Sequence, residues 1–180
     1  NEHSPIEAET TAALVRAAEL SGICPLARVR EIVEQYDFTR DRLAVELTED
    51  SYAHDRETAL RTIEGLHAMG LRIVLDDIGA GYSSLSDLST YPIDGVKIDR
   101  SIVIESALPR ARALLEGMIR LSHDMGIRVL CEGVEDKATC DAVLAAGCDF
   151  IQGFYFSRVL PGREAESFLR SLAARDRGEG

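Results

Sequence analysis

The segment Met69-Gly70-Leu71-Arg72-Ile73-Val74 predicts the class of fold, because the chain repeats its pattern as Met125-Gly126-Ile127-Arg128-Val129-Leu130. Each copy has the pattern of a helix end, a glycine that terminates the helix, and the start of a buried strand. A carboxylate follows at the end of each strand, Asp76 in the first copy and Glu132 in the second. Strands that alternate with helices predict right-handed βαβ units and a parallel sheet or barrel.

Five short apolar runs are the strand candidates, and helical periodicities fill the gaps between them. Each run is rich in Val, Ile, Leu or Phe, as buried parallel strands are. The runs span 43–47, 72–75, 95–98, 128–131 and 150–156. We identify no strand before residue 43, where the pattern favours a polar tail over 1–10 and two helices near 11–20 and 26–36. The expected organisation is a divergent N-terminal part over 1–42, an α/β portion over 43–175 and a disordered tail over 176–180.

Composition narrows the function classes. The 180 residues, 46% hydrophobic and 28% charged, fit one globular domain with a sizeable core, yet a complete eight-stranded barrel typically has about 250 residues. The formal net charge is −11 and no stretch concentrates Lys and Arg, which argues against DNA or RNA binding. No apolar run approaches about 18 residues, so we expect no membrane insertion. An anionic ligand would need metal ions to reverse the local field.

Polar side chains cluster at the ends of the predicted strands. In parallel α/β architectures these ends form one rim, where ligands bind. Converging carboxylates repel one another unless a cation compensates, and their oxygens suit hard ions such as Mg²⁺ or Mn²⁺. A carboxylate shared between two ions about 3.5–4 Å apart would build a two-metal phosphoryl-transfer site. The candidates are Glu46, Glu49, Asp76, Asp77, Lys97, Asp99, Glu132, Glu135 and Gln152.

Each candidate also has a purely structural interpretation. Glu46 lies between apolar neighbours, and a functional role is favoured because Glu is rarely buried without a partner. Asp76 and Asp77 could close an ordinary turn, and Lys97 could be a buried structural counter-ion. Asp99 could pair with Arg100 or cap a loop. Glu132 and Glu135 could cap the helix that follows them, and Gln152 could form hydrogen bonds with the backbone.

Six short motifs follow one another along the chain. They are Glu46-Leu47-Thr48-Glu49, the loop from Asp76 to Ser84 with Gly79 and Gly81, Lys97-Ile98-Asp99-Arg100-Ser101, Glu132-Gly133-Val134-Glu135, Gly147-Cys148-Asp149 with Gln152-Gly153, and Ser157-Arg158 with Leu160-Pro161. Their order and spacing match the ELTE, DDFGTGYSS, KIDRS, EGVE, GCDxxQG and SRPLP motifs of the EAL family of cyclic di-GMP phosphodiesterases. The chain therefore resembles that family over residues 43–172.

The resemblance implies a TIM-like α/β barrel that cleaves one phosphodiester bond of cyclic di-GMP to give linear pGpG, with two Mg²⁺ or Mn²⁺ ions. By motif match, Glu46 and Asp76 would bind the first ion. Asp76 would bridge to the second, with Asp77 and Glu132 nearby. Water on a divalent ion becomes acidic enough to supply hydroxide near neutral pH, and the ions offset charge on the phosphoryl oxygens.

The same resemblance assigns the remaining residues. Lys97 would hold or activate the attacking water, and Glu135 and Gln152 would support the metal-bound water. Glu49 would brace the loop over 76–84. The other residues with a supporting role are Gly79, Gly81 and Asp99. The substrate's usual location in this family, together with the absence of a targeting segment, implies a cytoplasmic protein.

Three departures from the family pattern bear on activity. The Glu-Ala-Leu motif is absent, with its metal-binding Glu and the Arg that follows it, and so is an Asn ligand from a VNLS-like strand. The loop has Ile78 and Ala80 where the family usually has Phe and Thr. We therefore expect an incomplete TIM-like barrel of the EAL type that lacks the first strands. Open strand edges favour association, so a homodimer, or segments from fused regulatory domains of a longer parent protein, would close the gap.

Three functions are open at this stage. The retained carboxylates and Lys97 favour a metal-dependent phosphodiesterase. The missing Glu, Arg and Asn, together with Ala80, favour a catalytically inactive EAL-like module that binds cyclic di-GMP or a protein partner. An unrelated metal-dependent barrel enzyme is the third, and the six ordered motifs argue against it.

Overall fold

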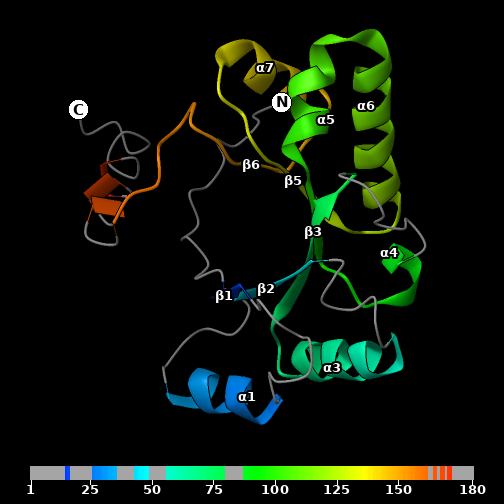
Figure 1. Cartoon of the computed structure of the whole chain (residues 1–180), viewed down its shortest axis with the longest axis vertical. Coiled ribbons are helices and arrows are strands. Elements are labelled where there is room, and N and C mark those ends of the chain that lie inside the picture. The colour runs from blue at the N-terminus through cyan, green and yellow to red at the C-terminus, as the bar shows by residue number, and fades with distance from the viewer. Residues whose placement is uncertain are drawn as a thin grey trace, which may run out of the picture.

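Parallel strands form one sheet, and helices lie along its outer side (Figure 1). The structure, a computed structural model, describes residues 15–16, 26–35, 43–48, 56–79, 87–161, 164–165, 167–168 and 170–171. The strands are β1 (Val15–Arg16), β2 (Ala44–Leu47), β3 (Arg72–Ile78), β4 (Gly95–Ile98), β5 (Arg128–Cys131) and β6 (Phe150–Ile151). The helices are α1 (Leu26–Gln35), α3 (Arg56–Ala68), α4 (Asp87–Thr90), α5 (Arg100–Ile104), the short 3₁₀ turn η2 (Glu105–Ala107), α6 (Pro109–Asp124) and α7 (Lys137–Ala145).

The order of the strands in the sheet is their order in the chain, β1-β2-β3-β4-β5-β6, and every neighbouring pair is parallel. This is the arrangement of successive βαβ units in a TIM-like barrel. In the described part of the chain β1 and β6 are the two ends of the sheet, so the fold is an incomplete TIM-like barrel. Figure 1 shows the strands along an arc, with the helices outside it.

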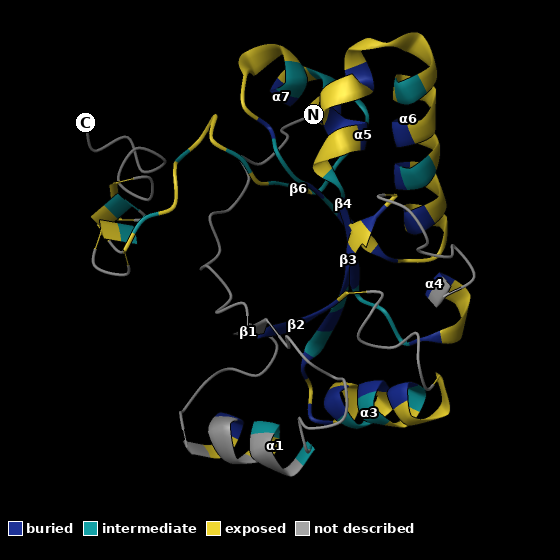
Figure 2. Ribbon diagram, viewed as in Figure 1, coloured by how far each residue is buried: buried dark blue, intermediate teal, exposed yellow. Residues whose placement is uncertain are grey.

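Side chains along each strand alternate between the face of the sheet that the helices cover and its inner face. The register aligns Leu47 with Leu75, Leu75 with Val96, and Val96 with Val129. These four side chains are buried and share one core with helix residues. Figure 2 shows buried positions in the strands and in α3 and α6. Because side chains alternate between the two faces, the residues between them point to the inner face. Glu46 and Lys97 are among these, which is why charged side chains occur within otherwise apolar strands.

The repeated helix–glycine–strand segment is confirmed. α3 and α6 each end before a glycine with positive φ, 82° at Gly70 and 76° at Gly126. Beyond these glycines, the amide of Leu71 donates to the carbonyl of Leu66 at 3.4 Å, and the amide of Ile127 donates to that of Ser122 at 2.9 Å. This is the Schellman ending, in which a glycine adopts the left-handed backbone conformation.

A second feature of the repeat is a carboxylate that holds the start of a strand. Oδ2 of Asp94, before β4, accepts a hydrogen bond from the amide of Ile73 at 2.7 Å. Oδ2 of Asp149, before β6, likewise accepts one from the amide of Val129 at 2.7 Å. Asp149 also contacts Nε2 of His123 at 2.8 Å. Each aspartate therefore ties the strand it precedes to the first residues of the neighbouring strand.

Several predicted elements differ from the structure. β1 pairs with β2 through Val15 and Arg16, so the predictions of a helix over 11–20 and of no strand before residue 43 are wrong at these residues. Main-chain pairing with the edge of β2 outweighs the local helical pattern there. The helix predicted near 26–36 is present as α1. The tails over 1–10 and 176–180 lie outside the described residues.

Two strand lengths also differ from the predictions. β3 runs to Ile78 rather than ending at 75, and β6 ends at Ile151 rather than 156. Just after β6, Gly153 lies directly against the main chain of Val134, where a Cβ atom would overlap the carbonyl oxygen. Among the helices whose residues are described, none is long and apolar enough to cross a membrane.

We predict that Asp149→Ala destabilises the fold, because it leaves the buried amide of Val129 without its acceptor. The expected loss is about 1–3 kcal/mol in the free energy of unfolding, measured by urea denaturation. Asp141→Ala is the matched control, because Asp141 pairs with Lys137 on the exposed surface of α7, and a change within about 0.5 kcal/mol is expected there. Equal losses in the two variants would contradict the prediction.

Candidate functional site

One buried lysine lies at the centre of the rim formed by the strand ends. Nζ of Lys97, on β4, is 3.1 Å from Oε1 of Glu46, 2.9 Å from Oδ1 of Asp76 and 2.6 Å from Oε1 of Glu132. The carboxylates come from β2, from β3 and from the residue that follows β5. Lys97, Glu46 and Asp76 are each at most 5% exposed. The fold thus brings together four residues that lie far apart in the sequence.

Among the residues that the structure describes, the charges in this cluster do not balance. Burial would lower the pKa of Lys97, but hydrogen bonds to Glu132 and Asp76, and their charges, outweigh it and hold the pKa above its ordinary value. Lys97 is therefore a cation at neutral pH. Burial raises the pKa of Glu132, Lys97 opposes this shift, and the charges of Asp76 and Asp77 add to it. One ammonium thus faces several carboxylates, and the excess negative charge favours binding of a further cation.

A β-bulge shapes the site on β3. The pairing of β3 with β4 slips between Leu75 and Ile78, so that two residues, Asp76 and Asp77, lie opposite Lys97 alone. Asp77 has φ of 57°, a left-handed conformation that is unusual for a residue with a side chain. Oδ1 of Asp76 accepts a hydrogen bond from the amide of Asp77 at 3.1 Å. The bulge re-aims consecutive side chains, which lets two neighbouring aspartates serve one site.

Three carboxylates at this rim fit a divalent ion. One oxygen each from Asp76, Asp77 and Glu132 lie within 4.8 Å of one another. Asp76 is buried, Glu132 is half-buried and Asp77 is exposed, so the group extends from the core to the surface. Carboxylate oxygens are the donors that Mg²⁺ and Mn²⁺ prefer, and the residues present therefore fit such an ion. Glu46 is held by Lys97 beside this group.

The other predicted residues lie around the cluster in different settings. Nη2 of Arg100 is 2.8 Å from Oε1 of Glu135. Gln152 follows β6 and uses its main chain, accepting from the amide of Val134 at 3.2 Å and donating to the carbonyl of Cys131 at 2.9 Å. Its side chain is exposed in the described structure. We did not predict the contact between Arg100 and Glu135, because residues from two strand ends meet only in the folded chain.

Asp99 and Gly79 have structural roles that explain their places. Asp99 caps α5 by accepting a hydrogen bond from the amide of Ser101 at 2.9 Å. Burial alone would raise the pKa of Asp99, but hydrogen bonds from Ser101 and the main chain hold it below its ordinary value. Gly79 has φ of 100° and lies against Ile102, whose Cδ1 a Cβ atom at this position would overlap. The predicted Glu49 and Gly81 lie outside the described residues.

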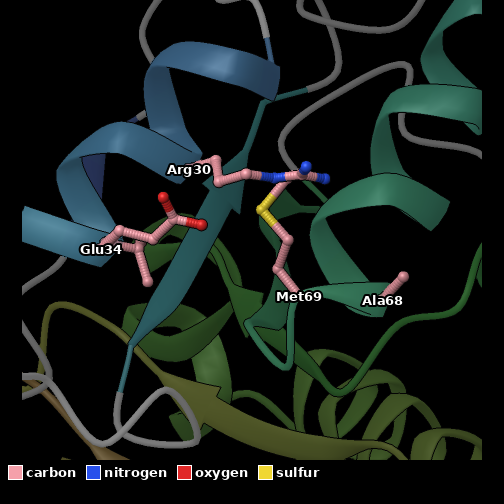
Figure 3. A pocket seen from close by; sticks show the side chains of 5 residues that line it. Arg30, Glu34, Ala68 and Met69 are labelled. Carbon is pink, nitrogen blue, oxygen red and sulfur yellow. The ribbon is translucent and has the colours of Figure 1, made fainter.

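A separate pocket lies between α1 and the end of α3 (Figure 3). It has a volume of about 210 Å³ and is lined by Arg30, Val33, Glu34, Ala68 and Met69. α3 ends just before β3 begins, so this pocket lies at the opposite end of the strands from the carboxylates. None of the predicted site residues that the structure describes lines it.

Fold and site together define a class. Carboxylates and a lysine at the carboxyl ends of parallel barrel strands are typical of metal-dependent α/β-barrel domains. The family model of the EAL domain matches residues 17–159, and the chain belongs to the EAL domain family.

Known proteins agree with this assignment. The chain is 31% identical over 156 residues to the cyclic di-GMP phosphodiesterase NbdA of Pseudomonas aeruginosa, a match that covers 86% of this chain and 20% of NbdA. Among solved structures, it is similar to the crystal structure of the EAL domain of Mycobacterium smegmatis DcpA, with a TM-score of 0.76, 34% identity, and coverage of 81% of this chain and 66% of that one. The manganese and cyclic di-GMP complex of Klebsiella pneumoniae BlrP1 at pH 6 matches with a TM-score of 0.69, 28% identity, and coverage of 74% and 34%.

The matched region is a small part of the curated relatives. It spans about a fifth of their length, 20% of the relative from Azorhizobium caulinodans and 18% of YkoW from Bacillus subtilis. The BlrP1 complex shows that manganese and cyclic di-GMP occur together in a solved structure similar to this one.

We predict that Lys97→Met destabilises the metal-free chain, because it leaves the buried Glu46 and Asp76 without their cation. Removing one partner of a buried ion pair costs about 3–5 kcal/mol, and urea denaturation in EDTA measures this loss. Addition of Mn²⁺ should restore part of it. Lys137→Met removes an exposed ammonium that pairs with Asp141 and is the control. A Lys97→Met chain as stable as the wild type in EDTA would contradict the prediction.

Proposed function

We propose that this chain is an EAL-type phosphodiesterase domain that hydrolyses cyclic di-GMP to pGpG by a two-metal mechanism. The observation that carries the proposal is the group of Asp76, Asp77 and Glu132 acceptors beside the Lys97 ammonium. The excess of carboxylates over cations supports a place for metal ions there. The similarity to NbdA, a cyclic di-GMP phosphodiesterase by name, supports the substrate.

In this proposal the carboxylates bind metal ions and the lysine acts on the attacking water. Asp76, Asp77, Glu132 and Glu46 would hold Mg²⁺ or Mn²⁺, and such ions lower the pKa of bound water and offset charge on phosphoryl oxygens. In this structure the three donors of the Lys97 ammonium face Glu46, Asp76 and Glu132. Metal ions held by these carboxylates would free a donor of Lys97 to orient the attacking water. The water oxygen bonds to phosphorus as one ester P–O bond breaks, and the released sugar oxygen takes a proton. Glu135 and Gln152 would support the water around the ions from the neighbouring strand ends.

A second candidate is a catalytically inactive module that binds cyclic di-GMP or a protein partner. The absence of the Glu-Ala-Leu motif and of the Asn ligand from the sequence favours it. Lys97 would then be a structural counter-ion, as its three ion pairs also allow. The retained carboxylates favour the first candidate, because several converging carboxylates are costly without a cation.

Product formation decides between the two candidates. We predict that the purified chain with Mn²⁺ converts cyclic di-GMP to pGpG, detected by chromatography, and that Asp76→Asn lowers the rate by at least about 100-fold, since even indirect partners of metal ligands contribute 10–100-fold. Asp141→Asn, on the exposed surface of α7, should leave the rate unchanged. No product from the wild type, with cyclic di-GMP bound in a calorimetric titration, would support the binding module instead.

We further propose that the chain forms a homodimer, works in the cytoplasm and is joined to regulatory domains in a longer parent protein. The length of its relatives supports the presence of regulatory domains. The usual location of the substrate in this family supports the cytoplasm. The exposed side of α6 supports the homodimer, since Leu114, Leu121 and Met125 are 53%, 39% and 39% exposed at helical spacing.

The charges on α6 favour a second copy as the occupant of this face. Gly117 has open space around it and lies between Leu114 and Leu121 in the sequence. Arg110 precedes Gly117 by seven residues and Asp124 follows it by seven. Two antiparallel copies of α6 that cross at Gly117 would therefore place Arg110 against Asp124 at both ends, with leucines between them. A two-fold interface of this kind is self-complementary.

We predict that Leu114→Glu dissociates the dimer, because it places a carboxylate in the apolar part of the interface. Sedimentation velocity should show a dimer for the wild type and a monomer for the variant. Leu144→Glu changes a leucine of similar exposure on α7, and this variant should remain a dimer. A wild-type chain that sediments as a monomer would contradict this interface.

A further inference from the structure

Arg100 contacts the turn that carries Glu132 at two points. A Cβ atom at Gly133 would overlap the Cβ, Cγ and Cδ atoms of Arg100, so the aliphatic part of the arginine lies directly on the glycine backbone. At its far end, Nη2 of Arg100 is 2.8 Å from Oε1 of Glu135. Only a glycine leaves room for this contact, and its φ of 70° also favours a glycine.

The opposite side of the same turn is held by the chain after β6. The amide of Val134 donates to the carbonyl of Gln152 at 3.2 Å, and the amide of Tyr155 donates to the carbonyl of Val134 at 3.0 Å. Val134 is fully buried, and its carbonyl lies against Gly153. The turn over 132–135 is therefore enclosed between Arg100 and the backbone at 152–155.

The backbone of Arg100 is itself fixed. It is the first residue of α5, directly after the cap formed by Asp99. The amide of Asp99 donates to the carbonyl of Ile78 at the end of β3, at 3.2 Å. Arg100 thus starts from a position tied to β3 and β4 and reaches the end of β5, so it connects the strand ends that supply Asp76, Lys97 and Glu132.

We propose that Arg100 is a positioning residue that sets the direction of the Glu132 side chain toward the other carboxylates and that of Glu135 beside it. The inference rests on the proposed metal-dependent function of this rim. Arg100 and Glu135 are half-exposed, with side chains 55% and 44% accessible, and an exposed ion pair contributes little to global stability. Its effect should therefore be local to the turn.

The direction in which Mn²⁺ affinity changes distinguishes a positioning role of Arg100 from a simple effect of its charge. Removing a positive charge near carboxylates would by itself strengthen binding of Mn²⁺. Loss of positioning weakens it, by about tenfold if Arg100 acts like the indirect partners of metal ligands. Weaker Mn²⁺ binding in a variant without the guanidinium is thus explained only by positioning.

The test compares Arg100→Met, Arg100→Ala and Arg100→Lys with Arg112→Met in the full chain. Arg112 pairs with Glu116 at 2.9 Å on α6 with similar exposure, 50% and 47%, and is the matched control. Hydrogen exchange of the Val134 amide should quicken about tenfold in Arg100→Ala, less in Arg100→Met, and remain unchanged in Arg112→Met. Mn²⁺ affinity should fall about tenfold in Arg100→Ala, and Arg100→Lys should retain most of it. Urea midpoints should match the control in every variant.

Each result decides something different. Unchanged exchange at Val134 in Arg100→Ala, or Mn²⁺ affinity that rises in Arg100→Met, would overturn the positioning role. A wild-type chain that binds no Mn²⁺ would overturn the proposed metal site, while the exchange of Val134 would still decide whether Arg100 holds the turn.

Discussion

The ammonium of Lys97 makes the rim of this domain possible. Glu46 and Asp76 are buried on adjacent strands, and burial of carboxylates without a counter-charge is costly. Lys97 provides that charge from the next strand and also contacts Glu132 beyond it. Strands β2, β3 and β4 are therefore joined by charge at their carboxyl ends as well as by their main chains. The same interaction leaves negative charge in excess, which is the physical reason a divalent ion suits this place.

Two local departures from regular structure adapt the sheet to this task. The bulge in β3 puts Asp76 and Asp77 opposite a single residue of β4, so a strand that would aim alternate side chains at opposite faces supplies two neighbours to one site. Asp77 adopts a left-handed backbone there, and conformations of this kind cost about 1–3 kcal/mol. Such strain persists where the surroundings fix it, and here the pairing of β3 with β4 resumes directly after Asp77, at Ile78.

The amino ends and the carboxyl ends of the strands have different roles. At the amino ends, Asp94 and Asp149 hold strand amides and repeat one structural device along the chain. At the carboxyl ends, the carboxylates face a lysine and the site opens to solvent. This division is usual for parallel barrels, in which one end stabilises the fold and the other carries the chemistry. The pocket between α1 and α3 belongs to the stabilising end.

The sequence alone predicts the class of fold, because a glycine after a helix and an apolar run after the glycine are local signals, and the repeat at Met69 and Met125 contains both. It also singled out Glu46 and Lys97, since a charge inside an apolar strand is unusual wherever the strand lies, and Asp76 and Glu132, since they close predicted strands. It misjudged the segment at Val15–Arg16, where pairing with β2 outweighs local preference. The contacts of Lys97 with three carboxylates and of Arg100 with Gly133 arise only in the folded chain. Such contacts depend on strand register and on the space between main chains, and neither quantity is encoded by neighbouring residues alone.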